Sequence, residues 1–187
     1  ELTTRSPQYA KAYKISFEGT PYKSPYKYQG AYPNGIKTIG DLLASCQSSS
    51  VLFELSSFKG GSSSALYPQK AEAVIVLQEN DVESFTARFE KSYEKVEESY
   101  QELEEPFQYT MTETELPGSV ISGEDTAHIV SLMYTMINGT YLRSDDKEVA
   151  AFSNIGKIST KKQMFRMEIN AKSLQNTLMD EMHTVFQ

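Results

Sequence analysis

Residues 51–77 read VLFELSSFKGGSSSALYPQKAEAVIVL. Two apolar segments, 51–58 and 71–77, flank a run of glycines and serines, a pattern that is typical of two strands joined by a turn. Beyond them, apolar side chains recur at steps of three or four over 82–103, which predicts a helix that Asp81 can cap. The stretch therefore predicts a strand–turn–strand unit followed by a helix.

The pattern extends outward in both directions. Residues 11–18 alternate between apolar and polar side chains and predict a strand, and residues 33–46 carry an apolar stripe and predict a helix. The later elements are expected to be a helix at 124–136, strands at 148–159 and 163–171, and an amphipathic helix at 174–186.

The order of these elements predicts the fold class. Strand, helix, strand, strand, helix and then strands indicates an α+β protein with a ferredoxin-like sandwich, an antiparallel sheet with helices on one face. Residues 1–187 are expected to form a single domain. Its core is assigned to about 11–104 and 147–187. About 105–146 is assigned to an insertion with an extra helix, within which 106–122 is expected to be irregular.

The composition excludes several kinds of protein. One cysteine, Cys46, and two histidines rule out an internal disulfide and leave few metal ligands. Cys46 falls in an apolar helix and is expected to be buried and inert. No apolar run is long enough to span a membrane and no signal peptide is visible, so we expect no membrane partner and a cytoplasmic location.

The net charge of -7 is spread unevenly along the chain. Residues 1–70 carry eight Lys and Arg against four Asp and Glu, and residues 149–187 carry five against three. Residues 71–148 carry five against eighteen. Such an acidic middle would repel phosphates, so no nucleic-acid partner is expected.

No complete catalytic motif is present. The chain lacks the glycine-rich phosphate loops and the Gly-x-Ser-x-Gly elbow. Asp125 and His128 lie three residues apart on an expected helix and could serve a small enzyme, although a solvent-facing histidine is the simpler interpretation. His183 lies late in the last helix, where a cation complements the helix dipole. Residues 138–140 fit a glycosylation sequon, which a turn also explains.

Residues 58–71 carry a family resemblance. Phe-Lys-Gly-Gly-Ser-Ser-Ser-Ala-Leu-Tyr-Pro-Gln-Lys-Ala resembles the Phe-x-Gly-Gly-Thr-x-x-Asn-x-Ile-Pro-x-x-Ala turn of the dinuclear-zinc peptidases that include aminoacylase, carnosinase and Xaa-His dipeptidase. In that family the turn joins two strands of the lid, or dimerisation, domain. Further motifs follow in the order of the Xaa-His dipeptidase branch: Tyr32-Pro33-Asn34-Gly35-Ile36-Lys37, Asp125-Thr126, Asn138-Gly139, Arg143-Ser144-Asp145, Ser153-Asn154-Ile155-Gly156 and Lys172-Ser173. The resemblance covers roughly residues 11–186.

The resemblance implies a lid and dimerisation domain that is not catalytic on its own. The zinc ligands and the catalytic glutamate would lie in a catalytic domain of the parent chain, outside these residues. The implied partners are that domain and a second copy, paired through the sheet edge or the first helix. The substrate-binding residues implied by the resemblance are Gly60, Gly61, Ser62, Lys172 and Lys23.

Three positions depart from the family pattern. The loop at 18–25 lacks the lid histidine, Ala65 replaces the turn asparagine, and Lys172 replaces an arginine and loses its bidentate fork. Lys23 could substitute as an oxyanion donor, although a surface lysine is the simpler interpretation. A free-standing ferredoxin-like module that binds a ligand or a protein, without peptidase activity, is therefore the alternative function.

Overall fold

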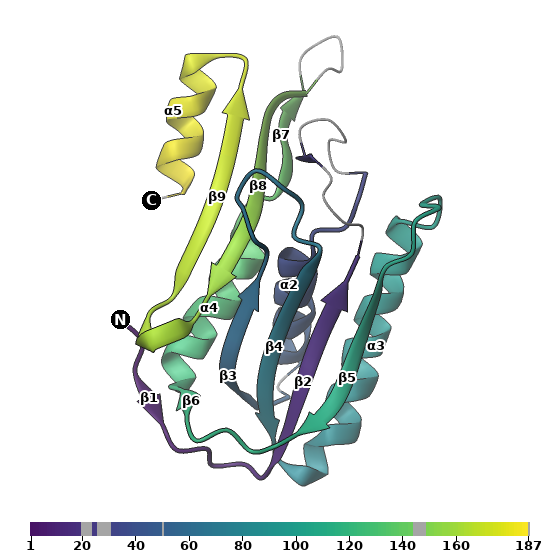
Figure 1. Cartoon of the computed structure of the whole chain (residues 1–187), viewed down its shortest axis with the longest axis vertical. Helices are drawn as coiled ribbons and strands as arrows, with labels where there is room; N and C mark the ends of the chain where they lie inside the picture. The colour runs from purple at the N-terminus through teal and green to yellow at the C-terminus, as the bar shows by residue number, and fades with distance from the viewer. Residues whose placement is uncertain (20–23, 26–30, 50, 144–148, 187) are drawn as a thin grey trace.

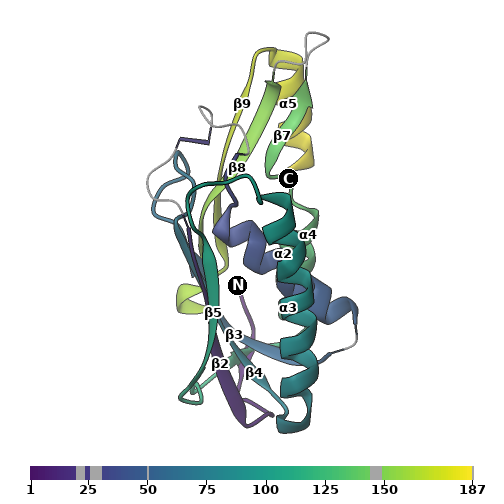
Figure 2. The same ribbon diagram turned by 90° about the vertical axis from the view of Figure 1, so that its right-hand side faces the viewer.

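A computed structural model describes residues 1–19, 24–25, 31–49, 51–143 and 149–186. In these residues, seven strands form one antiparallel sheet, and helices cover one of its faces (Figures 1 and 2). The predicted α+β class is confirmed. None of the helices in the described residues has the length and apolar character needed to cross a bilayer.

The sheet runs in the order β5-β2-β4-β3-β8-β7, with β9 also paired to β8. Its strands are β2 (Lys11–Glu18), β3 (Phe53–Gly60), β4 (Lys70–Leu77), β5 (Gln108–Thr114), β7 (Gly139–Arg143), β8 (Val149–Ser159) and β9 (Arg166–Ser173). The helices are α2 (Gly35–Ser48), α3 (Val82–Ser99), α4 (Gly123–Thr135) and α5 (Asn176–Val185), with short 3-10 turns η1 (Glu79–Asp81) and η2 (Lys161–Gln163). A separate pair joins β1 (Thr4–Arg5) to β6 (Val120–Ile121).

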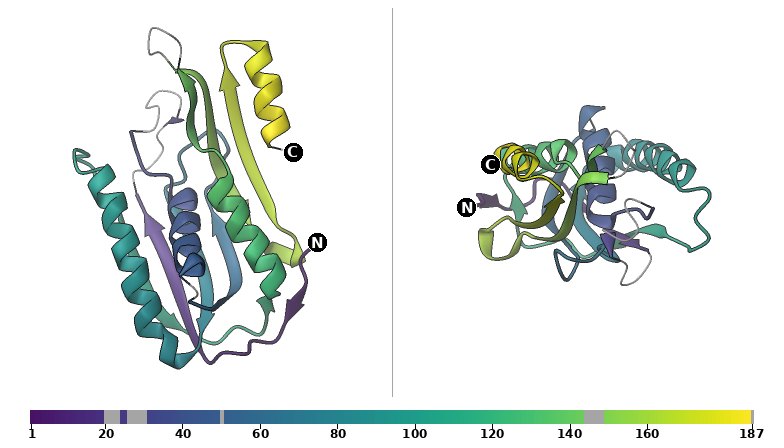
Figure 3. Two further views of the ribbon diagram at one scale, coloured as in Figure 1. Left: turned by 180° about the vertical axis from the view of Figure 1, so that it is seen from behind. Right: turned by 90° about the horizontal axis from the view of Figure 1, so that it is seen from above.

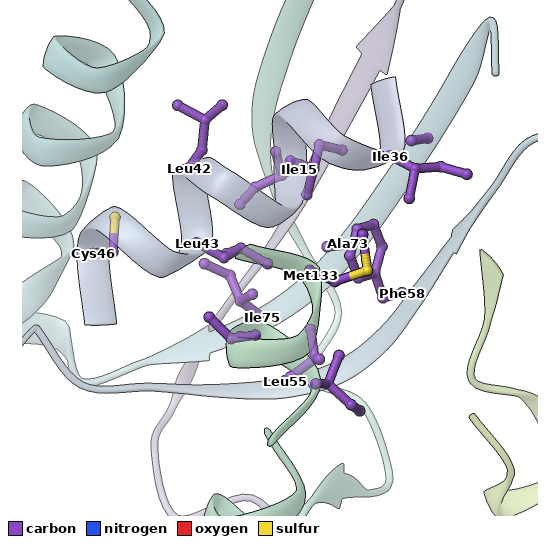
Figure 4. Packing of buried hydrophobic residues seen from close by; sticks show 14 of the residues in the cluster. Ile15, Ile36, Leu42, Leu43, Cys46, Leu55, Phe58, Ala73, Ile75 and Met133 are labelled. Atoms are coloured by element: carbon purple, nitrogen blue, oxygen red, sulfur yellow. The ribbon is translucent and has the colours of Figure 1, made fainter. Parts of the chain in front are cut away.

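The main core lies between the sheet and α2, α3 and α4 (Figure 4). Helix α2 begins where the Asn34 side chain accepts a hydrogen bond from the Lys37 N–H, and it buries an apolar stripe against the sheet. Its Gly40 allows α4 to approach, because a Cβ there would lie 2.8 Å from the Met133 Cβ. Helix α2 is thus the central helix, with α3 and α4 on either side of it (Figure 3).

The prediction that residues 106–122 are irregular is wrong. They contain β5, which pairs with β2 along its whole length, and the short strand β6. Tyr109 and Met111 point toward the core, and α3 covers them through the Phe89–Tyr109 and Tyr93–Tyr109 ring contacts. This burial explains why seven mostly polar residues form a strand.

The four strands β5-β2-β4-β3, with α2 and α3, make the ferredoxin-like order. Its fourth strand comes from within 105–146, which the sequence assigned to an insertion. Strands β8 and β9 extend the sheet beyond β3 instead of completing its core order. Their outer half has a small cluster of its own with α5, built from Ala150, Ala151, Leu178 and Met182.

Candidate functional site

The connection between β3 and β4 runs along β8. Gly61 has a φ of +69°, a left-handed conformation that favours glycine, and a Cβ there would overlap the Gly156 carbonyl. A Cβ on Gly156 would in turn overlap the backbone of Ser63 and Ser64. Two glycines 95 positions apart in sequence therefore allow two backbones to touch.

Hydrogen bonds of three asparagine side chains stabilise this backbone contact. The Asn154 amide donates to the carbonyls of Ser64 and Leu66, both at 2.9 Å. The Asn34 amide donates to Asn138 Oδ1 at 3.0 Å, to Asn154 Oδ1 at 3.2 Å and to the Ile155 carbonyl at 2.8 Å. Asn34 and Asn154 are buried. We call Asn34, Asn138 and Asn154 the asparagine node.

The node is continuous with the start of α2 and the end of α4. Asn138 Oδ1 also accepts from the Ile155 N–H at 2.9 Å. One turn into α2, Lys37 Nζ donates to the Met133 and Tyr134 carbonyls at 2.8 and 2.7 Å and pairs with Asp41 at 2.7 Å. A cation at the last carbonyls of α4 is favourable for the helix dipole.

The predicted substrate-binding residues fall in different places. Gly60 and Gly61 line a cavity of about 310 Å³ on the sheet face that the helices leave open. Ser62 is exposed on the turn and is not part of that lining. Lys172, opposite Phe152 on β8, lines a second cavity of about 210 Å³. Lys23 lies outside the described residues, so the described part of the chain brings only the two glycines into one cavity.

Asp125 has a structural role at the start of α4. Its Oδ2 accepts from the Thr3 N–H at 2.7 Å and from the Ser122 hydroxyl at 3.0 Å. The Thr3 N–H, which stabilises the carboxylate, holds the pKa of Asp125 below its usual value. His128 is exposed, as expected. In the described residues no group of three or more His, Cys, Asp or Glu side chains could hold a metal ion.

Two other sequence features also have structural explanations. Cys46 is fully buried, as predicted, and burial raises the pKa of its thiol to about 12. Asn138, the first residue of the glycosylation sequon, has its amide oxygen bound within the asparagine node. The sequence predicted only a turn at Asn138 and did not indicate these hydrogen bonds.

The comparisons with known proteins concern the fold. No protein-family model matches the chain, and no curated protein sequence matches it. Among solved structures, aminoacylhistidine dipeptidase from Vibrio alginolyticus matches with a TM-score of 0.91 at 18% sequence identity. The match covers 100% of this chain and 39% of that enzyme. The chain has the fold of one part of a dipeptidase. The resemblance drawn from the short motifs is thereby confirmed at the level of the fold.

Proposed function

We propose that this chain is a lid and dimerisation domain of a larger hydrolase resembling the Xaa-His dipeptidases, and that it is not catalytic alone. The observation that carries the proposal is the likeness of fold, which spans the whole chain but only 39% of the Vibrio enzyme. A domain of this kind would cover the substrate, and the remaining part of the parent would perform the hydrolysis.

The positions of the motifs support this proposal. Residues 34–37, 138–139 and 153–156 are far apart in sequence and meet at the β3–β4 turn, the motif on which the resemblance rests. Their contacts hold the turn in a fixed conformation. A lid that touches substrate would need such a fixed turn, because binding groups must be held in place before the substrate arrives.

The zinc implied by the resemblance is proposed to lie in the parent's catalytic domain. The described residues do not fit a zinc site, since they offer no cluster of three ligand side chains. The chemistry of this chain would be limited to polar contacts with substrate. Gly60, Gly61, Ser62 and Lys172, with Lys23, are the residues proposed for that contact.

Dimerisation is proposed to use the edge of β5. Helix α2, the other proposed surface, lies between α3 and α4 and buries eight of its residues. β5 contains no proline, lysine or bulge, which are usual protections of an edge strand, and its one charged residue, Glu113, pairs with Lys11 of β2. The opposite edge strand, β9, carries Arg166, Glu168 and Lys172. Antiparallel pairing of β5 with its copy would extend both sheets across a two-fold axis.

The test compares this chain with the product of its complete natural reading frame. We expect the complete protein, supplied with zinc, to hydrolyse Xaa-His dipeptides, and the 187-residue chain to be inactive in the same assay. Deletion of these residues from the complete protein should reduce kcat/KM strongly. A complete reading frame that encodes no hydrolase would overturn the proposal and favour the free-standing binding module.

A further inference from the structure

A cavity on the open face of the sheet has a strongly basic lining. Its volume is about 310 Å³, and residues at the ends of β3 and β8 line it. These two strand ends pair in the sheet, as Figure 1 shows. Four lysines from four elements line it, namely Lys59, Lys70, Lys157 and Lys161. Neither the resemblance nor the proposed function assigns a role to these lysines.

The hollow follows from the pairing of the two strands. β3 and β8 pair only through Lys59–Ser159 and Gly60–Ile158, after which the chain turns away at Gly61. The glycines present backbone to the cavity instead of side chains. Cationic side chains make up much of the rest of the lining.

Three of the four lysines around this space pair with a carboxylate. Glu72 is the one carboxylate in the lining, and it pairs with Lys59 at 2.9 Å. Lys157 pairs with Glu168 at 3.4 Å and Lys70 with Glu18 at 2.8 Å, and both glutamates lie outside the lining. The side chains of these three pairs are between 33% and 69% exposed, and exposed pairs contribute only about 0–1 kcal/mol each. An anion could therefore compete for several of the ammonium groups at small cost.

The fold keeps most of the acidic residues away from this cavity. The lysines come from residues 1–70 and 149–187, the two net-positive parts of the chain. The glutamate-rich helix α3 lies on the other side of the sheet (Figure 2). Ser159 adds a hydroxyl, whose oxygen accepts from the Lys161 N–H at 3.3 Å and which can also donate.

We propose that this cavity binds a small multivalent oxyanion, of the class of inorganic phosphate or a phosphate monoester. Several lysines act together on such a ligand as point charges, with the Ser159 hydroxyl as a hydrogen-bond donor. A monovalent carboxylate would interact with fewer of them. The proposal does not depend on the proposed lid function.

The test is a titration of the 187-residue chain with inorganic phosphate, followed by amide NMR at constant ionic strength. We expect saturable shifts at Gly60, Gly61 and Ser159. The double variant Lys59→Gln/Lys157→Gln should raise Kd at least tenfold. The control Lys91→Gln/Lys95→Gln makes the same change in net charge on the exposed face of α3 and should leave Kd within twofold.

Two results would overturn the proposal. One is a shift that does not saturate or that sodium chloride reproduces at equal ionic strength. The other is an equal loss of affinity in both double variants, which would indicate a non-specific charge effect. Acetate should bind at least tenfold more weakly than phosphate, and equal affinity would also count against it. If the first double variant does not fold, Lys161→Gln should still raise Kd several-fold.

Discussion

The Asn154 amide gives the β3–β4 connection the hydrogen bonds that a neighbouring strand would otherwise provide. Over 61–69 the β3–β4 connection has no ladder partner, yet the carbonyls of Ser64 and Leu66 are satisfied by one buried side chain. A buried polar group without a hydrogen-bond partner costs free energy. Asn154 therefore stabilises the protein by giving these carbonyls a partner. The same reasoning applies to Asn34, whose amide has three acceptors.

Replacing Asn154 with alanine should destabilise the protein considerably. Two partly buried carbonyls and the Asn34 amide would each lose a partner, and we expect a loss of about 3 kcal/mol in the free energy of unfolding. Urea denaturation measures this directly. Asn176→Ala is the control, because Asn176 is exposed on α5, and its effect should stay within about 0.5 kcal/mol. Equal effects of the two variants would contradict the role of the node.

Asp125 should make stability depend on pH in the acid range. Its pKa is lowered in the folded state, so its contribution is fully present above the unfolded pKa of about 3.9 and is lost as the pH falls through the folded value. Asp125→Ala should therefore lower Tm at pH 6, and the difference from the unmodified protein should shrink toward pH 2.

The control for this measurement is Asp180→Ala, an exposed aspartate on α5. It should lower Tm little at either pH. A gap between Asp125→Ala and the unmodified protein that stays constant from pH 6 to pH 2 would show that the carboxylate charge is not involved.

Among the elements, β5 is the one that the sequence predicted least well. It is also the proposed dimer interface. Its alternation rests on Phe107, Tyr109 and Met111, between a proline and a polar segment, and such a short signal is weak. The longer elements were predicted closely: the strand at 11–18 coincides with β2, and the helix expected at 33–46 is α2 at 35–48. The apolar faces of β2 and α2 are buried regardless of the neighbouring elements, whereas the apolar side chains of β5 are buried only because α3 covers them.

A charged β5 edge should prevent the proposed dimer. Thr110 and Thr112 are exposed on this strand, and lysines there would repel the same residues of a copy. We expect sedimentation velocity to give a dimer for the unmodified chain and a monomer for Thr110→Lys/Thr112→Lys. Thr177→Lys/Thr184→Lys adds the same charge on α5 and should remain dimeric. A monomeric unmodified chain would refute pairing through this edge.

At the scale of the whole molecule, the candidate site was less predictable than the fold. The short motifs could be quoted from the sequence, but nothing in their spacing placed Asn34 beside Asn154, 120 residues away. Contacts of this kind depend on the tertiary arrangement of α2, β8 and the turn. The basic cavity has the same origin, because its lysines belong to three strands and the turn η2, which come together only in the folded protein.

The reactivity of Cys46 should report on unfolding of the whole molecule. Its sulfur is buried between α2 and α3, and its pKa of about 12 keeps it protonated at neutral pH. We expect a thiol reagent to label the native protein at least a thousandfold more slowly than the protein in denaturant. Rapid labelling under native conditions would mean that α2 opens locally, which the packing between α3 and α4 argues against.

The asparagine node also has a consequence for the rate at which the protein folds. Five of its hydrogen bonds join residues 88 to 121 positions apart, so a long loop must close before these five can form. The pairings β3–β4, β7–β8 and β8–β9 join residues that are closer in sequence and can assemble first. The node would then close after the transition state, and weakening it would accelerate unfolding while leaving the folding rate nearly unchanged. The asparagine node would thus act mainly by prolonging the lifetime of the native state.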